Sequence, residues 1–422
     1  MRFLGIEAAG GILLMVATVV ALVWANSPWS GGYHDLWHTE FHLGVGDFRL
    51  EHHGHSLTLA ELVNDALMAV FFFVVGLEIK RELVDGHLRD RRAALLPAAG
   101  ALGGMVVPAV IYLICNQSGD ASAGWGIPMA TDIAFAVGVL SLLGDRISTP
   151  LKVFLLSLAI VDDIGAIIVI AVFYTSDLAT GWLALAVATT VAVVVLTRLK
   201  IWYTPLYILL GSVLWYAMFR SGVHATIAGV IMGLLAPAGA LLAPGEVGSI
   251  DVGSLDAEGL RAAKFRMNES VSVAARLERN LHPITGFVII PVFALANAGI
   301  EISGDSLHDA LGSGVTIGVV LGLVVGKVVG VSLFTIGAVR LGISAFPSGA
   351  TVRHIVGVAA IAGIGFTVSL FVTGLAFDDL VLQDEAKVGI LAASAIAALV
   401  GVVILLGARS PEGSVKGESL RG

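Results

Sequence analysis

The chain has 422 residues, of which 57% are hydrophobic and only 13% are charged, with a formal net charge of −8. Soluble globular proteins carry about 25% charged residues, so this composition excludes an ordinary soluble domain. The single cysteine excludes an internal disulfide framework, and no basic tract suggests a nucleic-acid partner.

Apolar runs of about 20 residues recur along the chain and are separated by short polar loops. They predict one all-α polytopic membrane domain over residues 1–422, because β-barrel strands would alternate in shorter segments. About twelve transmembrane helices are expected, at residues 5–25, 59–80, 95–115, 122–143, 150–175, 179–197, 203–219, 223–236, 280–299, 314–338, 355–376 and 386–408.

Two connecting segments are long. Residues 26–58 are rich in histidine and contain HLGVGDFRLE, which has the pattern of a small hairpin. A solvated loop is favoured over a metal site here, because no cysteine or spaced carboxylate set accompanies the histidines. Residues 237–275 begin rich in Ala, Gly and Pro and then become charged, which indicates a linker leading into the ninth helix.

The basic residues lie almost entirely on one side of this twelve-helix arrangement. Only Arg49, Arg220 and Lys387 fall on the opposite side, and Lys327 lies within a helix. Cytoplasmic loops of membrane proteins carry an excess of Lys and Arg. Both termini are therefore expected to be cytoplasmic.

Two of the expected helices are interrupted. The fourth carries Gly124, Gly126 and Pro128, and the eleventh reads AAIAGIGFTVSLF. Irregular backbone at membrane depth is tolerated where it is buried in protein or lines a water-filled cavity. These two helices are the middle members of two triplets, helices 3–5 (about 93–175) and 10–12 (about 314–408), which start an odd number of helices apart. The pattern predicts an inverted repeat whose broken helices point to a mid-membrane site.

The tenth helix contains glycines at a strict four-residue spacing. This spacing predicts a ridge on one helix face, along which another helix backbone can approach closely. The ridge consists of Gly314, Gly318, Gly322, Gly326 and Gly330. The eighth helix has a similar small-residue face, formed by Ala225, Gly229 and Gly233.

Asp162 and Asp163 lie near the centre of the apolar run VFLLSLAIVDDIGAIIVIAVFYTS. A central aspartate costs about 2.5–3.5 kcal/mol on insertion scales, and such residues mark ion or proton pathways. Adjacent helix residues point about 100° apart, so the two carboxylates are expected to have different neighbours. Lys327 is the buried counter-charge, which can act as a structural ion-pair partner or also carry a transported proton.

Thr131 and Asp132 follow the break in the fourth helix. They can cap the second half-helix or coordinate an ion, and the residue types alone leave both roles open. Asp163, Asp162 and Thr131 together offer the hard oxygen ligands that Na⁺ or Li⁺ prefers. Two close carboxylates titrate as a coupled pair, so a cation can bind when protons leave. Such exchange requires no cofactor and no nucleotide.

A group of charged residues is expected at the cytoplasmic end of the second and ninth helices. It consists of Glu78, Arg81, Glu82, Glu278 and His282. The spacing of the first three is typical of a local salt-bridge network. The same group is also a plausible gate that responds to pH.

Seven segments resemble bacterial sodium/proton antiporters of the NhaA type, in order and spacing across nearly the whole chain. They are NDALMAVFFFVVGLEIKREL, ATDIAFAVGVLSLLG, LAIVDDIGAIIVIAVFYT, SGVHATIAGV, LHPITGFVIIPVFALANAGI, VVGKVVGVSLF and GIGFTVSLF. The inverted repeat is a known property of that family. The resemblance implies electrogenic exchange of cytoplasmic Na⁺ or Li⁺ for a larger number of external protons, in a bacterial plasma membrane.

The resemblance also implies roles for single residues. Asp163 and Asp162 would form the ion and proton site, with Asp163 as the primary cation ligand. Thr131 and Asp132 would belong to the crossed broken helices, and Lys327 would pair with Asp162. The pH-sensing group would map to Glu78, Arg81, Glu82 and Glu278. The chain departs from the family pattern at Arg279, where a histidine is familiar, although His282 remains. The outer segment near 42–52 would contribute to a homodimer.

A cation channel is the alternative function, because charge-lined cavities serve both mechanisms. An intramembrane aspartyl protease is disfavoured, since its Gly-x-Gly-Asp signature occurs only at Gly44–Asp47 in the polar outer loop.

Overall fold

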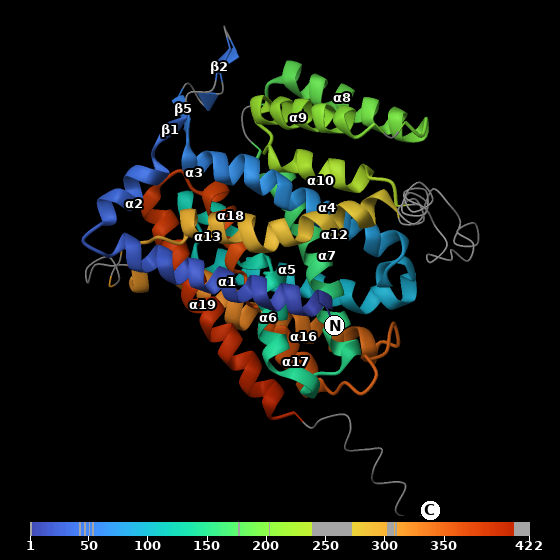
Figure 1. The fold of residues 1–422 in the computed structure, drawn as a ribbon. Helices are drawn as coiled ribbons and strands as arrows, with labels where there is room; N and C mark the ends of the chain where they lie inside the picture. Colours follow the sequence, from blue (N-terminus) through green and yellow to red (C-terminus); the bar gives the residue numbers. More distant parts are fainter. Residues whose placement is uncertain are drawn as a thin grey trace, which may run out of the picture. The chain divides into compact units, whose positions relative to one another are not determined.

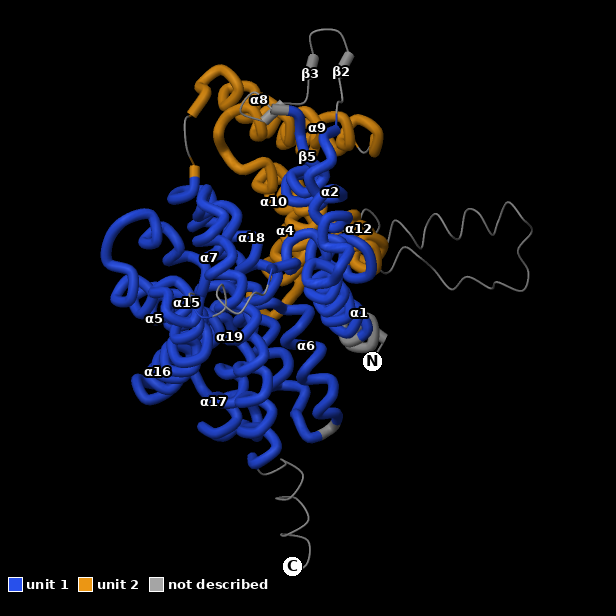
Figure 2. Tube along the Cα trace, turned by 90° about the vertical axis from the view of Figure 1, so that its left-hand side faces the viewer, with its two compact units in different colours: residues 1–67, 90–174, 286–422 blue, residues 68–89, 175–285 orange. Residues whose placement is uncertain are grey.

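The computed structural model describes residues 2–41, 44–45, 48–49, 51–52, 55–175, 178–201, 203–238, 272–301, 308 and 310–408. They divide into two compact units, which Figure 2 colours separately. The first unit comprises residues 1–67, 90–174 and 286–422, and the second comprises 68–89 and 175–285. Most of the predicted linker at 237–275 lies outside the described residues.

The first unit carries both interrupted helices. Its helical elements are α1 (Arg2–Ala25), α2 (Ser30–Trp37), α3 (Leu59–Leu62), the π turn η1 (Val63–Leu67), α5 (Arg91–Cys115), the 3₁₀ helix η3 (Asp120–Met129), α6 (Ile133–Leu142), η4 (Gly144–Arg146), α7 (Thr149–Phe173), α13 (Ile290–Asn297), α15 (Gly314–Leu321), the π turn η8 (Gly322–Gly326), α16 (Lys327–Arg340), α17 (Val352–Ile361), α18 (Phe366–Ala376) and α19 (Leu380–Leu406) (Figure 1).

The second unit is also helical. It contains α4 (Met68–Val84), η2 (His87–Arg89), α8 (Thr180–Arg198), α9 (Thr204–Ser221), α10 (Thr226–Leu235) and α12 (Val273–Ile284). A third π turn, η7 (Thr285–Ile289), joins α12 to α13.

Each of the twelve expected segments coincides with a helix or with a helix that is bent or interrupted. Within the described ranges, seven helices are long and apolar enough to cross a membrane, and three bent pairs raise this number to ten. Helices α9 and α10 account for the two remaining segments. The prediction of an all-α polytopic membrane protein is confirmed.

Both predicted breaks are present. The axis bends by 43° between η3 and α6 and by 49° between α17 and α18. The two predicted triplets have the same order of elements, a continuous helix, a broken helix and a continuous helix: α5, η3–α6 and α7 in one, and α15–α16, α17–α18 and α19 in the other.

The close helix approach predicted for the glycine ridge is present, and its partner is α5. An added Cβ at Gly326 would lie 2.8 Å from Pro108 Cα, and one at Gly330 would lie 2.1 Å from the Gly103 carbonyl oxygen. In an ideal α-helix a four-residue spacing drifts by about 40° per step, so the five glycines would spread over about 160°. The π turn η8 holds one extra residue and turns the helix back by about 100°. The π turn therefore brings the whole ridge onto α5.

Within the second unit, the backbones of α10 and α4 also approach each other closely. Added Cβ atoms at Gly229 and Gly233 of α10 would lie 2.0 Å from the Ala69 carbonyl oxygen and 2.5 Å from the Phe73 carbonyl oxygen of α4. Gly76 of α4 faces Gly233 in return. The predicted small-residue face of the eighth expected helix is thus a packing surface.

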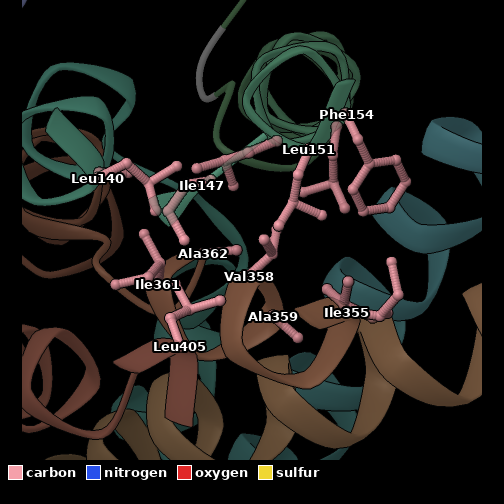
Figure 3. Packing of buried hydrophobic residues seen from close by; sticks show 14 of the residues in the cluster. Leu140, Ile147, Leu151, Phe154, Ile355, Val358, Ala359, Ile361, Ala362 and Leu405 are labelled. Carbon is pink, nitrogen blue, oxygen red and sulfur yellow. The ribbon is translucent and has the colours of Figure 1, made fainter. Parts of the chain in front are cut away.

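A hydrophobic cluster supports the broken helices from one side. Leu151 and Phe154 of α7 pack with Val358 of α17 and Leu405 of α19 (Figure 3). Ala362, at the break between α17 and α18, belongs to the same cluster and is fully buried. The cluster fixes the backbone next to the interruption, which is where the candidate site lies.

The predicted hairpin in the outer segment is confirmed, since β2 (Gly44–Val45) pairs antiparallel with β3 (Phe48–Arg49). The pairing of β1 (Glu40–Phe41) with β5 (His55–Thr58), and of β5 with β4 (Glu51–His52), extends this small β structure. The expectation of a loop is wrong for residues 30–37, which form α2. This helix forms because Tyr33 and Trp37 are buried and the Tyr33 hydroxyl donates to the Leu295 carbonyl at 2.7 Å.

Candidate ion-binding site

The two adjacent aspartates lie in the middle of α7. Asp162 is fully buried and Asp163 is 5% exposed. Because successive residues of a helix point about 100° apart, the two carboxylates lie in different surroundings. Within the described residues, Asp162 Oδ1 has no hydrogen-bond partner.

The buried counter-charge predicted from the sequence is in place. Lys327 Nζ lies 2.6 Å from Asp162 Oδ2, and both side chains are 0% exposed. The ammonium also donates to Thr131 Oγ1 at 3.1 Å. The structure therefore brings together Lys327 of α16, Asp162 of α7 and Thr131, which lies in the break between η3 and α6.

The π turn η8 sets the direction of Lys327. The Lys327 backbone N–H bonds to the Gly322 carbonyl five residues earlier, in place of the α-helical partner four residues earlier. Beside it, an added Cβ at Gly104 of α5 would lie 3.6 Å from Lys327 Nζ. That distance is an ordinary van der Waals contact, whereas the same Cβ would lie only 2.8 Å from Val331 Cγ2, so the glycine allows α5 and α16 to pack closely beside the lysine.

Asp132 joins the two broken helices. Its Oδ1 accepts a hydrogen bond from the Phe135 N–H at 2.9 Å, which caps α6. Its Oδ2 accepts from the N–H of Thr367 at 3.0 Å and from the Thr367 hydroxyl at 2.6 Å, in the first turn of α18. The backbone N–H of Asp132 donates to the Ile364 carbonyl at 2.7 Å. Of the two roles left open by the sequence, the geometry corresponds to capping, here of two helix N-termini by one carboxylate.

Hydroxyl groups bond to backbone carbonyl groups near the ends of α17 and η3, the first halves of the two broken helices. Thr131 Oγ1 lies 2.8 Å from the Ala362 carbonyl oxygen at the end of α17, and also 2.8 Å from Asp162 Oδ2. Its single hydrogen can go to only one of them at a time. Ser369 of α18 donates to the Ile127 carbonyl of η3 at 2.7 Å. At Gly365 an added Cβ would lie 3.0 Å from the Ala130 carbonyl oxygen, so the crossing favours a glycine there.

This arrangement offers oxygen atoms to a small hard cation. Within the described part of the chain, no three His, Cys, Asp or Glu side chains gather as a metal-binding group. A cation held by Asp162 and Asp163 would therefore complete its shell with hydroxyl, backbone carbonyl or water oxygens, which suits Na⁺ or Li⁺ better than a transition metal.

The predicted charged group assembles within the second unit. Arg81 of α4 forms an ion pair with Glu278 of α12 through its Nη1 atom. Its Nη2 atom lies 3.5 Å from Glu82 Oε1. His282 Nε2 lies 4.0 Å from Glu78 Oε1. Arg279 is exposed. The group is therefore a real network, with Glu278 buried at its centre.

Sequence reasoning missed two members of the crossing, Thr367 and Ser369. Both follow the Gly363–Gly365 break closely in AAIAGIGFTVSLF. Hydroxyl residues just after a helix break are frequent capping residues, and that signal was available in the sequence. Their acceptors, by contrast, belong to another helix more than 230 positions away, which no local pattern identifies.

Comparison with known proteins defines the family. The family model described as "Na+/H+ antiporter 1" matches residues 1–405. The chain belongs to this family.

Relatives in the family are similar over nearly the whole chain. The Na(+)/H(+) antiporter NhaA 3 of Frankia alni is 48% identical, over 97% of this chain and 89% of that protein. The Na(+)/H(+) antiporter NhaA of Rhodopirellula baltica is 47% identical, over 96% of this chain and 93% of that protein. That of Oleidesulfovibrio alaskensis is 44% identical, over 97% and 95% respectively. The family match includes both broken helices and every residue of the site.

Proposed function

We propose that this chain is a secondary antiporter that exchanges Na⁺ or Li⁺ for H⁺ across a bacterial plasma membrane, without a cofactor and with both termini in the cytoplasm. The observation that carries the proposal is the buried group of Asp162, Lys327 and Thr131 beside Asp163 at the crossing of two broken helices. Membership of the Na⁺/H⁺ antiporter family supports antiport over the alternative of a cation channel.

Exchange follows from competition for the same carboxylates. With no cation bound, Lys327 compensates the charge of Asp162, and a proton on Asp163 removes the remaining cost of burial. A cation that enters can use Asp162 Oδ1, which has no hydrogen-bond partner among the described residues, or draw Oδ2 away from Lys327, and it displaces the proton from Asp163. If the site faces only one side of the membrane at a time, proton entry from one side drives cation release on that side.

The number of proton-carrying groups favours electrogenic exchange. The site holds three groups that can carry protons, Asp162, Asp163 and Lys327, whereas one cation carries one charge. A cycle that returns two protons for each cation would move net charge and respond to the membrane potential.

Two further properties belong to the proposal. The network of Glu78, Arg81, Glu82, Glu278 and His282 is proposed to regulate the exchange by pH, because the Arg81–Glu278 ion pair joins α4 to α12 near Glu78 and His282. The strands near 42–52 are proposed to take part in a homodimer. Most side chains of that segment lie outside the described residues.

The test is a vesicle assay with purified protein. Vesicles carry an internal pH indicator, the membrane potential is clamped, and a Na⁺ gradient is imposed. Antiport requires proton movement opposite to the sodium flow, and sodium movement with no proton movement would establish a channel instead.

Two variants locate the site in the same assay. Asp163→Asn is expected to abolish exchange with insertion intact. The matched control is Asp384→Asn, which removes a half-exposed carboxylate paired with Lys387 at 3.1 Å and is expected to leave exchange unchanged. Full activity of Asp163→Asn would place the ion site elsewhere.

A further inference from the structure

The half-helix that leads to the site has an unusual form. η3 is a 3₁₀ helix of ten residues, Asp120–Met129. Runs of 3₁₀ helix longer than three or four residues are uncommon, because their hydrogen bonds have poorer geometry than those of an α-helix. A run of this length needs contacts from outside the helix to persist.

Two tyrosine hydroxyls supply such contacts. Tyr174, directly after α7, donates to the Ala123 carbonyl at 2.7 Å and accepts from the Gly126 N–H at 3.1 Å. Tyr112 of α5 donates to the Ala121 carbonyl at 2.8 Å. Both hydroxyls therefore bond to backbone groups of η3.

The glycines of η3 are fitted to these tyrosines. An added Cβ at Gly126 would lie 2.6 Å from the Tyr174 hydroxyl, and one at Gly124 would lie 2.4 Å from the Tyr112 hydroxyl. Trp125, between the two glycines, stacks on Tyr174 at 6.3 Å between ring centroids. The sequence Gly-Trp-Gly thus matches the positions of the two hydroxyls.

The form of η3 determines where the ion site begins. A 3₁₀ helix rises about 2.0 Å per residue and an α-helix about 1.5 Å. Conversion of ten residues from 3₁₀ to α would therefore shorten the segment by about 5 Å. η3 ends at Met129, only two residues before Thr131, whose hydroxyl lies 2.8 Å from Asp162 Oδ2. A change of that size would remove Thr131 from hydrogen-bond distance.

We propose that Tyr174 and Tyr112 are positioning residues that hold η3 in its 3₁₀ form and thereby place Thr131 at the cation site. This inference rests on the proposed function, because the consequence it names is the binding of the transported cation. The two hydroxyls act through the backbone of η3 and do not touch the cation.

The experiment compares Tyr174→Phe, Tyr112→Phe and the double variant with the wild-type protein. Phenylalanine keeps the ring and removes only the hydroxyl. The matched control is Tyr207→Phe, which removes a tyrosine hydroxyl that donates to the Ile201 carbonyl at 2.9 Å in the second unit. Two quantities are measured: the KM and kcat for Na⁺-driven proton movement in vesicles, and hydrogen–deuterium exchange of the backbone amides of residues 120–129.

The loss of one hydrogen bond of about 0.5–1.5 kcal/mol corresponds to a change of about two- to twelvefold. For Tyr112→Phe, which loses one hydrogen bond, we expect KM for Na⁺ to rise by about this factor with kcat unchanged, and amide exchange in η3 to accelerate by a similar factor. For Tyr174→Phe, which loses two, both effects should be larger. The control is expected to change neither quantity.

Two results would overturn the assignment. Unchanged KM with unchanged exchange in η3 would show that the hydroxyls do not hold this segment. A lower melting temperature with unchanged KM would show a purely structural role. The amide-exchange measurement needs no transport, so a wild-type protein that fails to exchange Na⁺ for H⁺ would refute the proposed function alone.

Discussion

The ion pair between Lys327 and Asp162 allows a quantitative test of what a buried charge pair contributes. Its two atoms are 2.6 Å apart and both side chains are 0% exposed. At an effective dielectric constant of about 20, Coulomb attraction at that separation is about 6 kcal/mol. Removal of the charged groups from water offsets much of this, but removal of one partner leaves the other charge buried and typically costs about 3–5 kcal/mol.

We therefore expect Lys327→Met and Asp162→Asn each to lower the free energy of unfolding by about 3–5 kcal/mol. The double variant should lose less than either single one, because no uncompensated charge remains. The assay is a denaturant titration of the purified protein in detergent micelles. Lys387→Met is the control, since its partner Asp384 is half-exposed and such pairs contribute at most about 1 kcal/mol. If the loss in the double variant equals the sum of the two single losses within about 0.5 kcal/mol, the reasoning is refuted.

Three further predictions concern helix capping, helix packing and an ion pair. Asp132→Ala removes the cap of two helix N-termini and should lower the free energy of unfolding by about 1–4 kcal/mol, at about 0.5–2 kcal/mol per cap. A loss below about 1 kcal/mol would contradict the double-cap role. Gly330→Ala should destabilise the protein by at least about 1–3 kcal/mol, because the added Cβ would collide with the backbone of Gly103. Gly337→Ala should be neutral, because the space around Gly337 is open. Equal melting temperatures of the two variants would refute this prediction. Arg81→Gln should lower the melting temperature, and Glu278→Gln in the same protein should restore part of the loss; no restoration would show that the pair is not coupled.

The chemistry of the site was largely predictable from sequence. Asp162 and Lys327 are charges in apolar runs, and a charge at membrane depth requires a partner. The residues alone predicted that Lys327 pairs with an aspartate of the site, and the choice of Asp162 among them was implied by the family resemblance. The spacing of Gly314 to Gly330 likewise indicated a packed face, because close helix contact has few other sequence signatures.

The form of the backbone around the site was not predictable. The π turn η8 and the 3₁₀ helix η3 have no strong local signature, because both are selected by contacts with other helices. Tyr174 and Ser369 bond to η3 from segments far along the chain, and a one-dimensional pattern does not show which backbone groups they meet. For the same reason the sequence left the role of Asp132 open between capping and coordination.

The double cap at Asp132 has an electrostatic consequence for transport. Each helix N-terminus carries about half a positive elementary charge, so the ends of α6 and α18 together balance one carboxylate. The crossing is then close to neutral in itself, whether the neighbouring site holds protons or a cation. The field that a passing ion meets is therefore governed by Asp162, Asp163 and Lys327. Because one side chain bonds to both half-helices, they are expected to shift together as one rigid piece when the site changes the side of the membrane that it faces.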